Sequence, residues 1–239
     1  MDSVLPSRTP IAVLAGLALV ALCAPAAAEA ANPPKRFEGV TVVRYLMGRV
    51  QPSLKARGAA HLWTNTGFSN RRAVYPVLEH RALKNGSEWL RVRTIRGRQN
   101  VNVWIPRWAT RRVWLHYRVL VDLSSRKAKV YRDGKLAKRF RVVVGAPGTP
   151  TPRGHFYVVD RMHLRDSWAR GGWALATSAF SNVLTDFAGG SGEVAMHTRG
   201  SLSAPVGTAA SHGCIRFNDR DIRWMAAHVP NGTPVWIQR

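Results

Sequence analysis

The stretch of this sequence best suited to covalent chemistry ends at one cysteine. Cys214 follows His212 by two residues and His197 by 17 residues. A cysteine nucleophile needs a base that takes its proton and N–H donors that stabilise the oxyanion formed on attack. A free thiol has a pKa of about 8.5, so a neighbouring histidine is the natural proton acceptor. The spacing is therefore compatible with a nucleophilic thiol served by one of the two histidines.

The same residues allow other interpretations. Gly213 gives the tight turn in which consecutive N–H groups can hold an oxyanion, but a lone cysteine is more often a small buried hydrophobe. His197, His212 and Cys214 could also supply three zinc ligands, although His-x-Cys is not a usual ligand spacing and no fourth ligand is evident. The residues alone leave a nucleophile, a metal site and an inert thiol open.

The elements that must position these residues are predicted to be mostly strands. Asp133-Gly134 joins two alternating segments and indicates a two-residue hairpin turn. One helix is expected, because Asn218 is a good N-cap and the apolar residues over 222–229 recur on one face before Pro230. Residues 233–238 are predicted to form a final strand.

The N-terminal half carries short strand-like runs between about residues 40 and 110. Residues 89–93 alternate apolar and basic side chains after the turn signal Asn85-Gly86, and residues 101–105 form another apolar run closed by Pro106. Closely spaced short strands favour a small β-barrel. The segment resembles bacterial SH3-like domains through WLRV at 89–92 and VWIP at 103–106.

The first thirty residues have the pattern of a secretory signal peptide. Arg8 precedes an apolar run over residues 11–24, and about 14 residues are too few for a comfortable span of about 20. Ala28-Glu29-Ala30 fits the A-x-A cleavage pattern. We expect cleavage after Ala30, with Ala26 or Ala28 as alternative sites and an uncleaved N-terminal anchor as the other possibility. The protein is then exported, to a periplasm or cell wall.

The composition and net charge indicate the kind of surroundings in which the protein works. The 239 residues include 36 Lys and Arg against 13 Asp and Glu, a formal charge of +23, and 46% are apolar, which excludes a disordered chain. Cleavage removes two acids, one base and Cys23, which changes the charge to +24 and leaves Cys214 without a partner for an internal disulfide. The charge favours anionic cell-wall polymers as surroundings. Nucleic acid is not expected, because the basic residues are scattered and no nucleic-acid motif appears.

The residues from His197 onward carry a resemblance to a known family. His197, a spacer and SHGCIR at 211–216 are similar to the pattern of the L,D-transpeptidase catalytic domain. The resemblance covers about residues 117–239 and includes GTPTPRG at 148–154 and GTPV at 232–235. Together with the SH3-like resemblance of the N-terminal half, it implies a mainly β fold, in which a small SH3-like β-barrel precedes a mixed β-sandwich catalytic domain with one clear helix. We therefore divide the chain into four parts: signal peptide 1–30, flexible lead 31–40, SH3-like β domain 41–112 and catalytic domain 117–239.

The resemblance also implies roles for the residues of the motif. Members of this family are exported enzymes that cut peptidoglycan stem peptides between an L-centre and a D-amino acid. Cys214 would be the nucleophile and His197 its base. Thr198, which replaces a glycine common in the family, would orient His197 through its carbonyl group. The N–H groups of His212, Gly213 and Cys214 would hold the oxyanion.

Four further residues are candidate substrate contacts. Ser211 and Arg216 would position the loop or the substrate, and for Arg216 a stem-peptide carboxylate and an internal ion pair are equally open. Trp168 and Trp173 would wall the acyl site within residues 161–192, or else belong to the core, the more common place of a tryptophan.

The chemistry leaves several functions open. An amine acceptor gives a cross-linking transpeptidase, water gives an L,D-carboxypeptidase, and a protein amine gives attachment of a protein to the wall. A non-catalytic, cationic wall-binding protein is the alternative from another class. We expect no metal or cofactor, a monomer, and acylation by carbapenem-type inhibitors.

Overall fold

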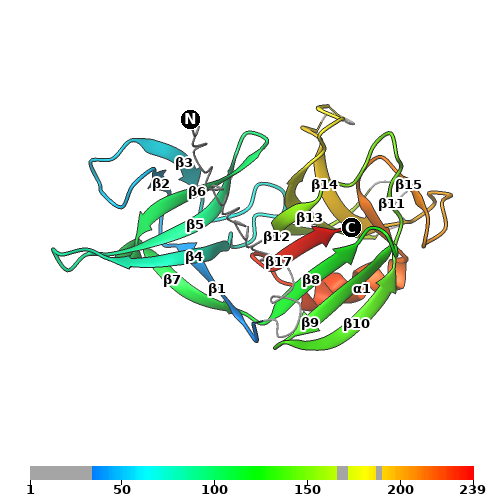
Figure 1. The fold of residues 1–239 in the computed structure, drawn as a ribbon, viewed down its shortest axis with the longest axis horizontal. Helices are drawn as coiled ribbons and strands as arrows, with labels where there is room; N and C mark the ends of the chain where they lie inside the picture. Colours follow the sequence, from blue (N-terminus) through cyan, green and yellow to red (C-terminus); the bar gives the residue numbers. More distant parts are fainter. Residues whose placement is uncertain (1–33, 166–171, 187–189) are drawn as a thin grey trace, which may run out of the picture. The chain divides into compact units, whose positions relative to one another are not determined.

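The structure is a computed structural model, and it describes residues 34–165, 172–186 and 190–239. The N-terminal half of the described chain folds into a seven-stranded sheet in the order β3-β2-β6-β5-β4-β1-β7 (Figure 1). Its strands are β1 (Phe37–Val42), β2 (Leu46–Arg49), β3 (Gly58–Leu62), β4 (Tyr75–Ala82), β5 (Glu88–Arg96), β6 (Gln99–Pro106) and β7 (Thr110–Leu115), with a 3-10 turn η2 (Arg107–Ala109) before β7.

The β5–β6 hairpin follows directly from the sequence pattern. Apolar and basic residues alternate along β5, and Leu90 and Val92 are buried in the core of the sheet beside Ile105. The turn between the two strands contains only Gly97 and Arg98, because Arg96 already pairs with Gln99. The two runs of residues predicted as strands, 89–93 and 101–105, therefore extend to within two residues of each other.

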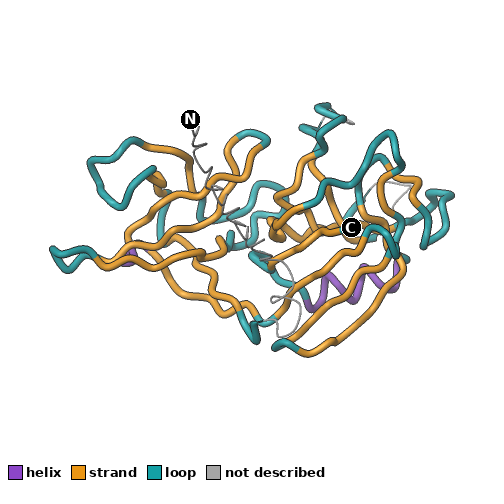
Figure 2. The backbone as a smooth tube through the Cα atoms, viewed as in Figure 1, coloured by secondary structure: helices purple, strands orange, loops and turns teal. Residues whose placement is uncertain are grey.

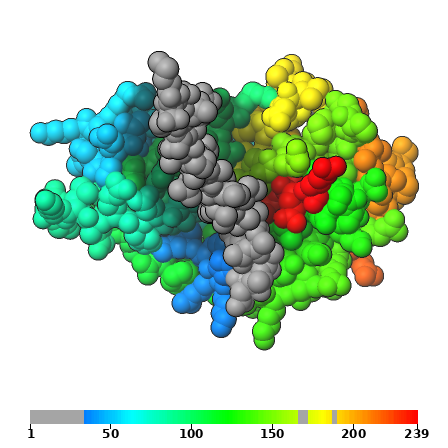
Figure 3. Space-filling view, viewed as in Figure 1, coloured from blue at the N-terminus to red at the C-terminus, as the bar shows by residue number. Residues whose placement is uncertain are grey.

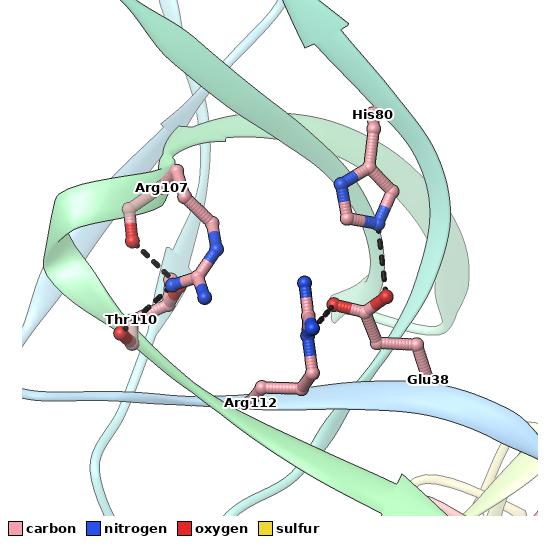
Figure 4. Close-up of polar contacts among 5 residues, drawn as sticks. All are labelled: Glu38, His80, Arg107, Thr110 and Arg112. Carbon is pink, nitrogen blue, oxygen red and sulfur yellow. Dashed lines mark hydrogen bonds and ion pairs between the residues drawn. The ribbon is translucent and has the colours of Figure 1, made fainter.

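The first strand begins earlier than predicted. β1 starts at Phe37, inside the segment 31–40 predicted as a flexible lead, and it pairs with β7 along its whole length. Glu38 holds this edge, since its carboxylate accepts hydrogen bonds from Arg112 Nε at 3.0 Å and from His80 Nε2 at 2.9 Å (Figure 4). Nearby, Arg107 donates to Thr110, which fixes the turn before β7 (Figure 4). The likeness of this sheet to SH3-like domains stays a prediction.

The C-terminal half contains an eight-stranded sheet in the order β10-β9-β8-β17-β12-β13-β14-β16 and a small two-stranded ladder of β11 and β15. The strands are β8 (Tyr117–Asp122), β9 (Lys127–Arg132), β10 (Lys135–Arg141), β11 (Val144–Gly145), β12 (Gly154–His163), β13 (Trp173–Phe180), β14 (Glu193–Thr198), β15 (Ala209–Ser211), β16 (Ile215–Phe217) and β17 (Pro234–Gln238). The α-helix of the described residues, α1 (Asp219–His228), packs against β13 and β14 (Figures 1 and 2). The predicted mainly β fold with one clear helix is confirmed.

Two local predictions are confirmed for the course of the backbone. Asp133 and Gly134 have φ angles of 49° and 79°, the left-handed pair that a type I′ hairpin turn needs. The helix begins after Asn218, whose carbonyl accepts from the Asp221 and Ile222 N–H groups at 2.9 and 3.0 Å. The Asn218 side chain makes no capping bond and instead donates to the Asp221 carboxylate.

The apolar face of α1 completes the core of the C-terminal sheet. Ile222, Met225 and Val229 are fully buried in the cluster that also holds Met196 and Phe217. The chain ends at the surface, where Gln238 and Arg239 are exposed (Figure 3, red).

The two sheets are joined by polar contacts. Asp160 on β12 is fully buried, and its carboxylate accepts from the Ser69 N–H at 2.8 Å and from the Ser69 hydroxyl. Arg93 on β5 donates to the carbonyl of His155 at 2.7 Å. The N-terminal sheet therefore contacts the sheet that carries Cys214 at defined points.

The predicted signal peptide, 1–30, lies outside the described residues. Within the ranges that the structure describes, there is no helix with the length and hydropathy needed to cross a membrane.

Candidate active site

The pairing of β14 with β16 brings the predicted residues together. The strands run parallel, with Met196 opposite Ile215 and His197 opposite Arg216. Side chains alternate between the faces of a sheet, and Met196 and Ile215 are buried in the core. His197 and Arg216 therefore point to the opposite face, which Cys214 shares because it lies two residues before Arg216.

A cavity of about 410 Å³ opens on this face. His197, His212, Cys214 and Arg216 all line it, so residues separated along the chain meet in one pocket. The rest of its lining comes from Ser181, Leu184, Gly192, Glu193, Val194 and Leu202.

His197 is held as a neutral base. Its side chain is only 9% exposed, and Nδ1 donates to the Thr198 carbonyl at 2.7 Å. This hydrogen bond sets the tautomer in which Nε2 is the proton-accepting nitrogen. Burial lowers the pKa of His197 to about 4, the hydrogen bond to Thr198 raises it in part, and the positive charge of Arg216 lowers it further. The imidazole is thus uncharged at neutral pH.

Thr198 is anchored by a residue that the sequence analysis did not single out. The Thr198 hydroxyl donates to the carboxylate of Asp219, which also accepts from the Gly200 N–H at 3.0 Å. Asp219 is the first residue of α1, so the helix fixes the carbonyl that orients His197. The space for the Thr198 side chain depends on Gly172, where a Cβ would lie 2.3 Å from the Thr198 methyl carbon. An acidic residue directly after a predicted N-cap was the available signal.

The thiol of Cys214 is protonated at rest. Its sulfur accepts from the Ala195 N–H at 3.5 Å and lies 4.0 Å from the Glu193 carbonyl, to which it donates. Burial raises the pKa of Cys214, while the Ala195 N–H and the charge of Arg216 lower it in part. The resting pair is therefore a neutral thiol and a neutral imidazole, which suits proton transfer during attack.

Hydrogen bonds from buried side chains stabilise the turn before Cys214. Ser211 is 1% exposed, and its hydroxyl donates to the Cys214 carbonyl at 2.6 Å and accepts from the Gly213 N–H at 3.2 Å. Gly213 has a φ of 112°, a conformation that favours glycine. Thr149 and Thr151, from the GTPTPRG motif at 148–154, donate to the carbonyls of Ser211 and Gly213 at 3.0 and 2.8 Å.

These contacts show which of the predicted residues line the cavity and which stabilise the loop before Cys214. Ser211 was expected to position either the loop or the substrate. It stabilises the loop and does not line the cavity, so its contacts fit the first role. The Gly213 N–H, expected to hold an oxyanion, points at the Ser211 hydroxyl. His212 is exposed at the cavity wall.

Arg216 faces the cavity, and one nitrogen of its guanidinium has no hydrogen-bond partner. Its Nε is buried without a hydrogen-bond partner, and no carboxylate of the described residues forms an ion pair with it. Burial lowers the pKa of Arg216, and the neighbouring Cys214 raises it in part. Of the two interpretations given to this residue, the internal ion pair is not found in the described chain.

Residues 116–237 match the model of the YkuD family, described as the L,D-transpeptidase catalytic domain. That match covers half of the chain. The chain belongs to the L,D-transpeptidase catalytic domain family. The family predicted from the motifs is confirmed.

Known proteins of this kind are similar to the chain. The protein named L,D-transpeptidase YkuD in Bacillus licheniformis is 33% identical over 121 residues, 51% of this chain and 65% of that protein. Its namesake in Bacillus subtilis is 28% identical over 123 residues, 52% of this chain and 66% of its own length. The chain thus spans just under two thirds of these relatives. An L,D-transpeptidase structure from Mycobacterium tuberculosis is 16% identical, covers 83% of this chain and 98% of its own, and gives a TM-score of 0.48.

One predicted substrate contact of this L,D-transpeptidase domain is wrong. Trp173 packs against the core and lies edge-on to His163, with ring centroids 5.3 Å apart. It lines a different cavity, beside Arg71 and Arg161. Its place on β13 explains this, because Trp173 pairs with His163 at the start of the strand and the cavity at Cys214 takes its wall from residues beyond the end of β13. Trp168 lies outside the described residues.

The arrangement of side chains also bears on the zinc interpretation. In the part of the chain that the structure describes, no three His, Cys, Asp or Glu residues are grouped so that they could hold a metal ion. The two histidines and Cys214 that share the cavity therefore do not form such a group.

Proposed function

We propose that this protein is an exported cysteine transpeptidase that cuts a peptidoglycan stem peptide at an L–D bond and forms a cross-link. One observation carries the proposal. His197 on β14 and Cys214, which directly precedes the parallel neighbour β16, face one cavity, and the bond from Nδ1 to the Thr198 carbonyl leaves Nε2 of His197 to accept a proton.

The first step is acylation of Cys214. Sγ attacks the carbonyl carbon of the L-centre while its proton passes to Nε2 of His197, so that a C–S bond forms as the carbonyl becomes an oxyanion. Collapse of this intermediate breaks the C–N bond. The D-amino acid leaves as an amine after it takes the proton back from His197, and a thioester remains on Cys214. The Thr198 carbonyl stabilises the imidazolium that exists between the two transfers, through the 2.7 Å bond to Nδ1.

Substrate recognition falls to Arg216 and the turn before the nucleophile. The guanidinium of Arg216 faces the cavity with a buried, unmatched Nε, which suits a carboxylate of the stem peptide. Among the N–H groups predicted to hold the oxyanion, that of Cys214 is the first candidate, because it belongs to the same residue as the thiol. The Gly213 N–H already donates to the Ser211 hydroxyl.

The second step decides the product. The amine of a second stem peptide attacks the thioester, the new amide forms, and the thiol regains its proton through His197. Water in place of the amine would release a shortened stem peptide, the carboxypeptidase outcome. The cavity lining of Leu184, Val194 and Leu202 beside the thiol favours an organic acceptor over bulk water.

Export and the wall as surroundings rest on the N-terminal pattern and on charge. A leader of the signal-peptide type and a formal charge of +23 suit a protein that works among anionic wall polymers. The thiol of Cys214, which lines the cavity, also suits acylation by a carbapenem, whose strained ring opens on a nucleophile.

The test is mass spectrometry of the products formed from tetrapeptide stems, with and without an added acceptor amine. We expect a dimer with loss of a D-amino acid when the acceptor is present. Release of the D-amino acid with no dimer would assign the hydrolase instead, and unchanged stems would favour the non-catalytic wall-binding protein.

A further inference from the structure

The tip of the β5–β6 hairpin, in the N-terminal sheet, reaches the active-site half of the molecule. Its turn consists of Gly97 and Arg98, and Arg98 is partly buried although Arg96, Gly97 and Gln99 around it are exposed. An arginine at a hairpin tip normally extends into water. The burial of this one therefore calls for a partner.

The partner is a set of backbone carbonyls between β13 and β14. The Arg98 guanidinium donates to Ser181 at 2.5 Å, to Thr185 at 3.0 Å, to Leu184 at 3.4 Å and to Ser191. A guanidinium carries five N–H donors in a fixed plane, which allows one side chain to hold several carbonyls at once. No described carboxylate forms an ion pair with Arg98, so the hydrogen bonds of its guanidinium go to these backbone carbonyls.

The residues that Arg98 holds form one wall of the Cys214 cavity. Ser181 and Leu184 line that cavity from one end of the connection, and Gly192 lines it from the other. Ser181 N–H also donates to the Gly192 carbonyl at 2.8 Å, which ties the two ends together. Arg98 thus spans both ends, and Gly192 leads directly into β14.

Gly192 gives independent evidence that this packing is specific. Its φ is 71°, and a Cβ there would lie 2.0 Å from the Leu184 carbonyl oxygen and 2.8 Å from Nη1 of Arg98. A backbone atom cannot move aside cheaply at such a distance. Any side chain at position 192 would therefore push Leu184 away from Arg98.

We propose that Arg98 is a positioning residue for the active site, which fixes the Ser181–Leu184 wall of the cavity from the N-terminal sheet. The proposal rests on the transpeptidase function given above. His197 and Cys214 are placed by the β14–β16 register and by Asp219, not by Arg98. Loss of Arg98 should therefore weaken the binding of an acyl donor and leave the intrinsic reactivity of the thiol unchanged.

The experiment measures acylation of Cys214 by imipenem over a range of concentrations, followed by mass spectrometry on the full chain. In Arg98→Ala we expect the half-saturating concentration to rise about tenfold, as for the loss of one or two charge-assisted hydrogen bonds, with the limiting rate nearly unchanged. Arg98→Lys should recover part of the loss, and Gly192→Ala should reproduce it. Arg96→Ala is the matched control, because Arg96 lies on the same hairpin and its described contact is the Ala59 carbonyl of its own sheet.

Alkylation of Cys214 by iodoacetamide separates positioning from general damage. This small reagent needs the thiol but not the wall, so its rate should be equal in the wild-type protein, Arg98→Ala and Arg96→Ala. An Arg98→Ala protein with unchanged half-saturation by imipenem would overturn the proposal, and so would an equal loss in both reactions. A wild-type protein that imipenem does not acylate would overturn the transpeptidase function itself.

Discussion

The buried neutral state of His197 makes the fold acid-sensitive in a measurable way. Burial lowers the pKa of His197 to about 4, against 6.5 for an ordinary histidine. The unfolded chain therefore binds this proton more tightly than the folded protein. The stabilising contribution is complete above pH 6.5 and is lost progressively as the pH falls from about 6.5 toward 4.

The magnitude follows from the two pKa values. A tenfold difference in proton affinity corresponds to about 1.4 kcal/mol, so the difference between 6.5 and about 4 amounts to about 3 kcal/mol at pH 4. His197→Gln removes the titration, and its amide N–H is still able to donate to the Thr198 carbonyl. Other acid-sensitive groups remain in both proteins and cancel in the comparison.

The assay is urea unfolding followed by circular dichroism at pH 7 and pH 4, with a reductant to protect Cys214. The wild-type protein should lose about 3 kcal/mol more of its free energy of unfolding than His197→Gln over this interval. Equal losses in the two proteins would refute a buried neutral imidazole. A resting imidazolium–thiolate pair holds the same number of protons as the neutral pair, so the measurement tests whether the buried pair resists a further proton and not which of the two groups holds the first one.

Four further outcomes follow from the site. Cys214→Ala should abolish cross-linking and the imipenem adduct while circular dichroism stays unchanged; residual cross-linking would remove the nucleophile assignment. Acylation should be nearly constant from about pH 6 to 8 and fall as the pH approaches 4, because protonated His197 cannot accept a proton; a pH–rate profile with a midpoint near 6.5 would contradict this. Arg216→Gln should raise KM for stem peptides about tenfold or more by loss of a charged pairing, with Arg216→Lys in between; an unchanged KM would exclude a carboxylate partner. Treatment with EDTA should leave the rate unaltered, and a loss restored by zinc would revive a metal site.

Much of the site was visible in the sequence because its residues are clustered along the chain. The order of His197 and the SHGCIR stretch identified the family, which the match over residues 116–237 confirmed. The Asp133-Gly134 turn and the helix after Asn218 were equally predictable, because a hairpin turn depends on two neighbouring residues and a helix on the period of its apolar face.

The predictions that proved wrong concern residues whose surroundings come from elsewhere in the chain. Trp173 was a candidate wall of the acyl site, but its position at the start of β13 places it beside His163. Residues 37–40 looked irregular, yet β7 supplies the partner strand that makes them part of a sheet. Neither outcome could be deduced from a local pattern, since each depends on a pairing between segments far apart in sequence.

The sequence by itself indicated the candidate chemistry and the family: a thiol at Cys214, a candidate base and a glycine turn. Only the tertiary structure decided the charge states of the catalytic pair and the hydrogen bonds that hold the site in place. Burial makes His197 and Cys214 neutral at rest, Asp219 anchors Thr198 from the helix, and Arg98 reaches across 83 positions of sequence to the Ser181 carbonyl. Burial and distant hydrogen bonds are properties of packing, and packing is set by how strands pair across the whole chain.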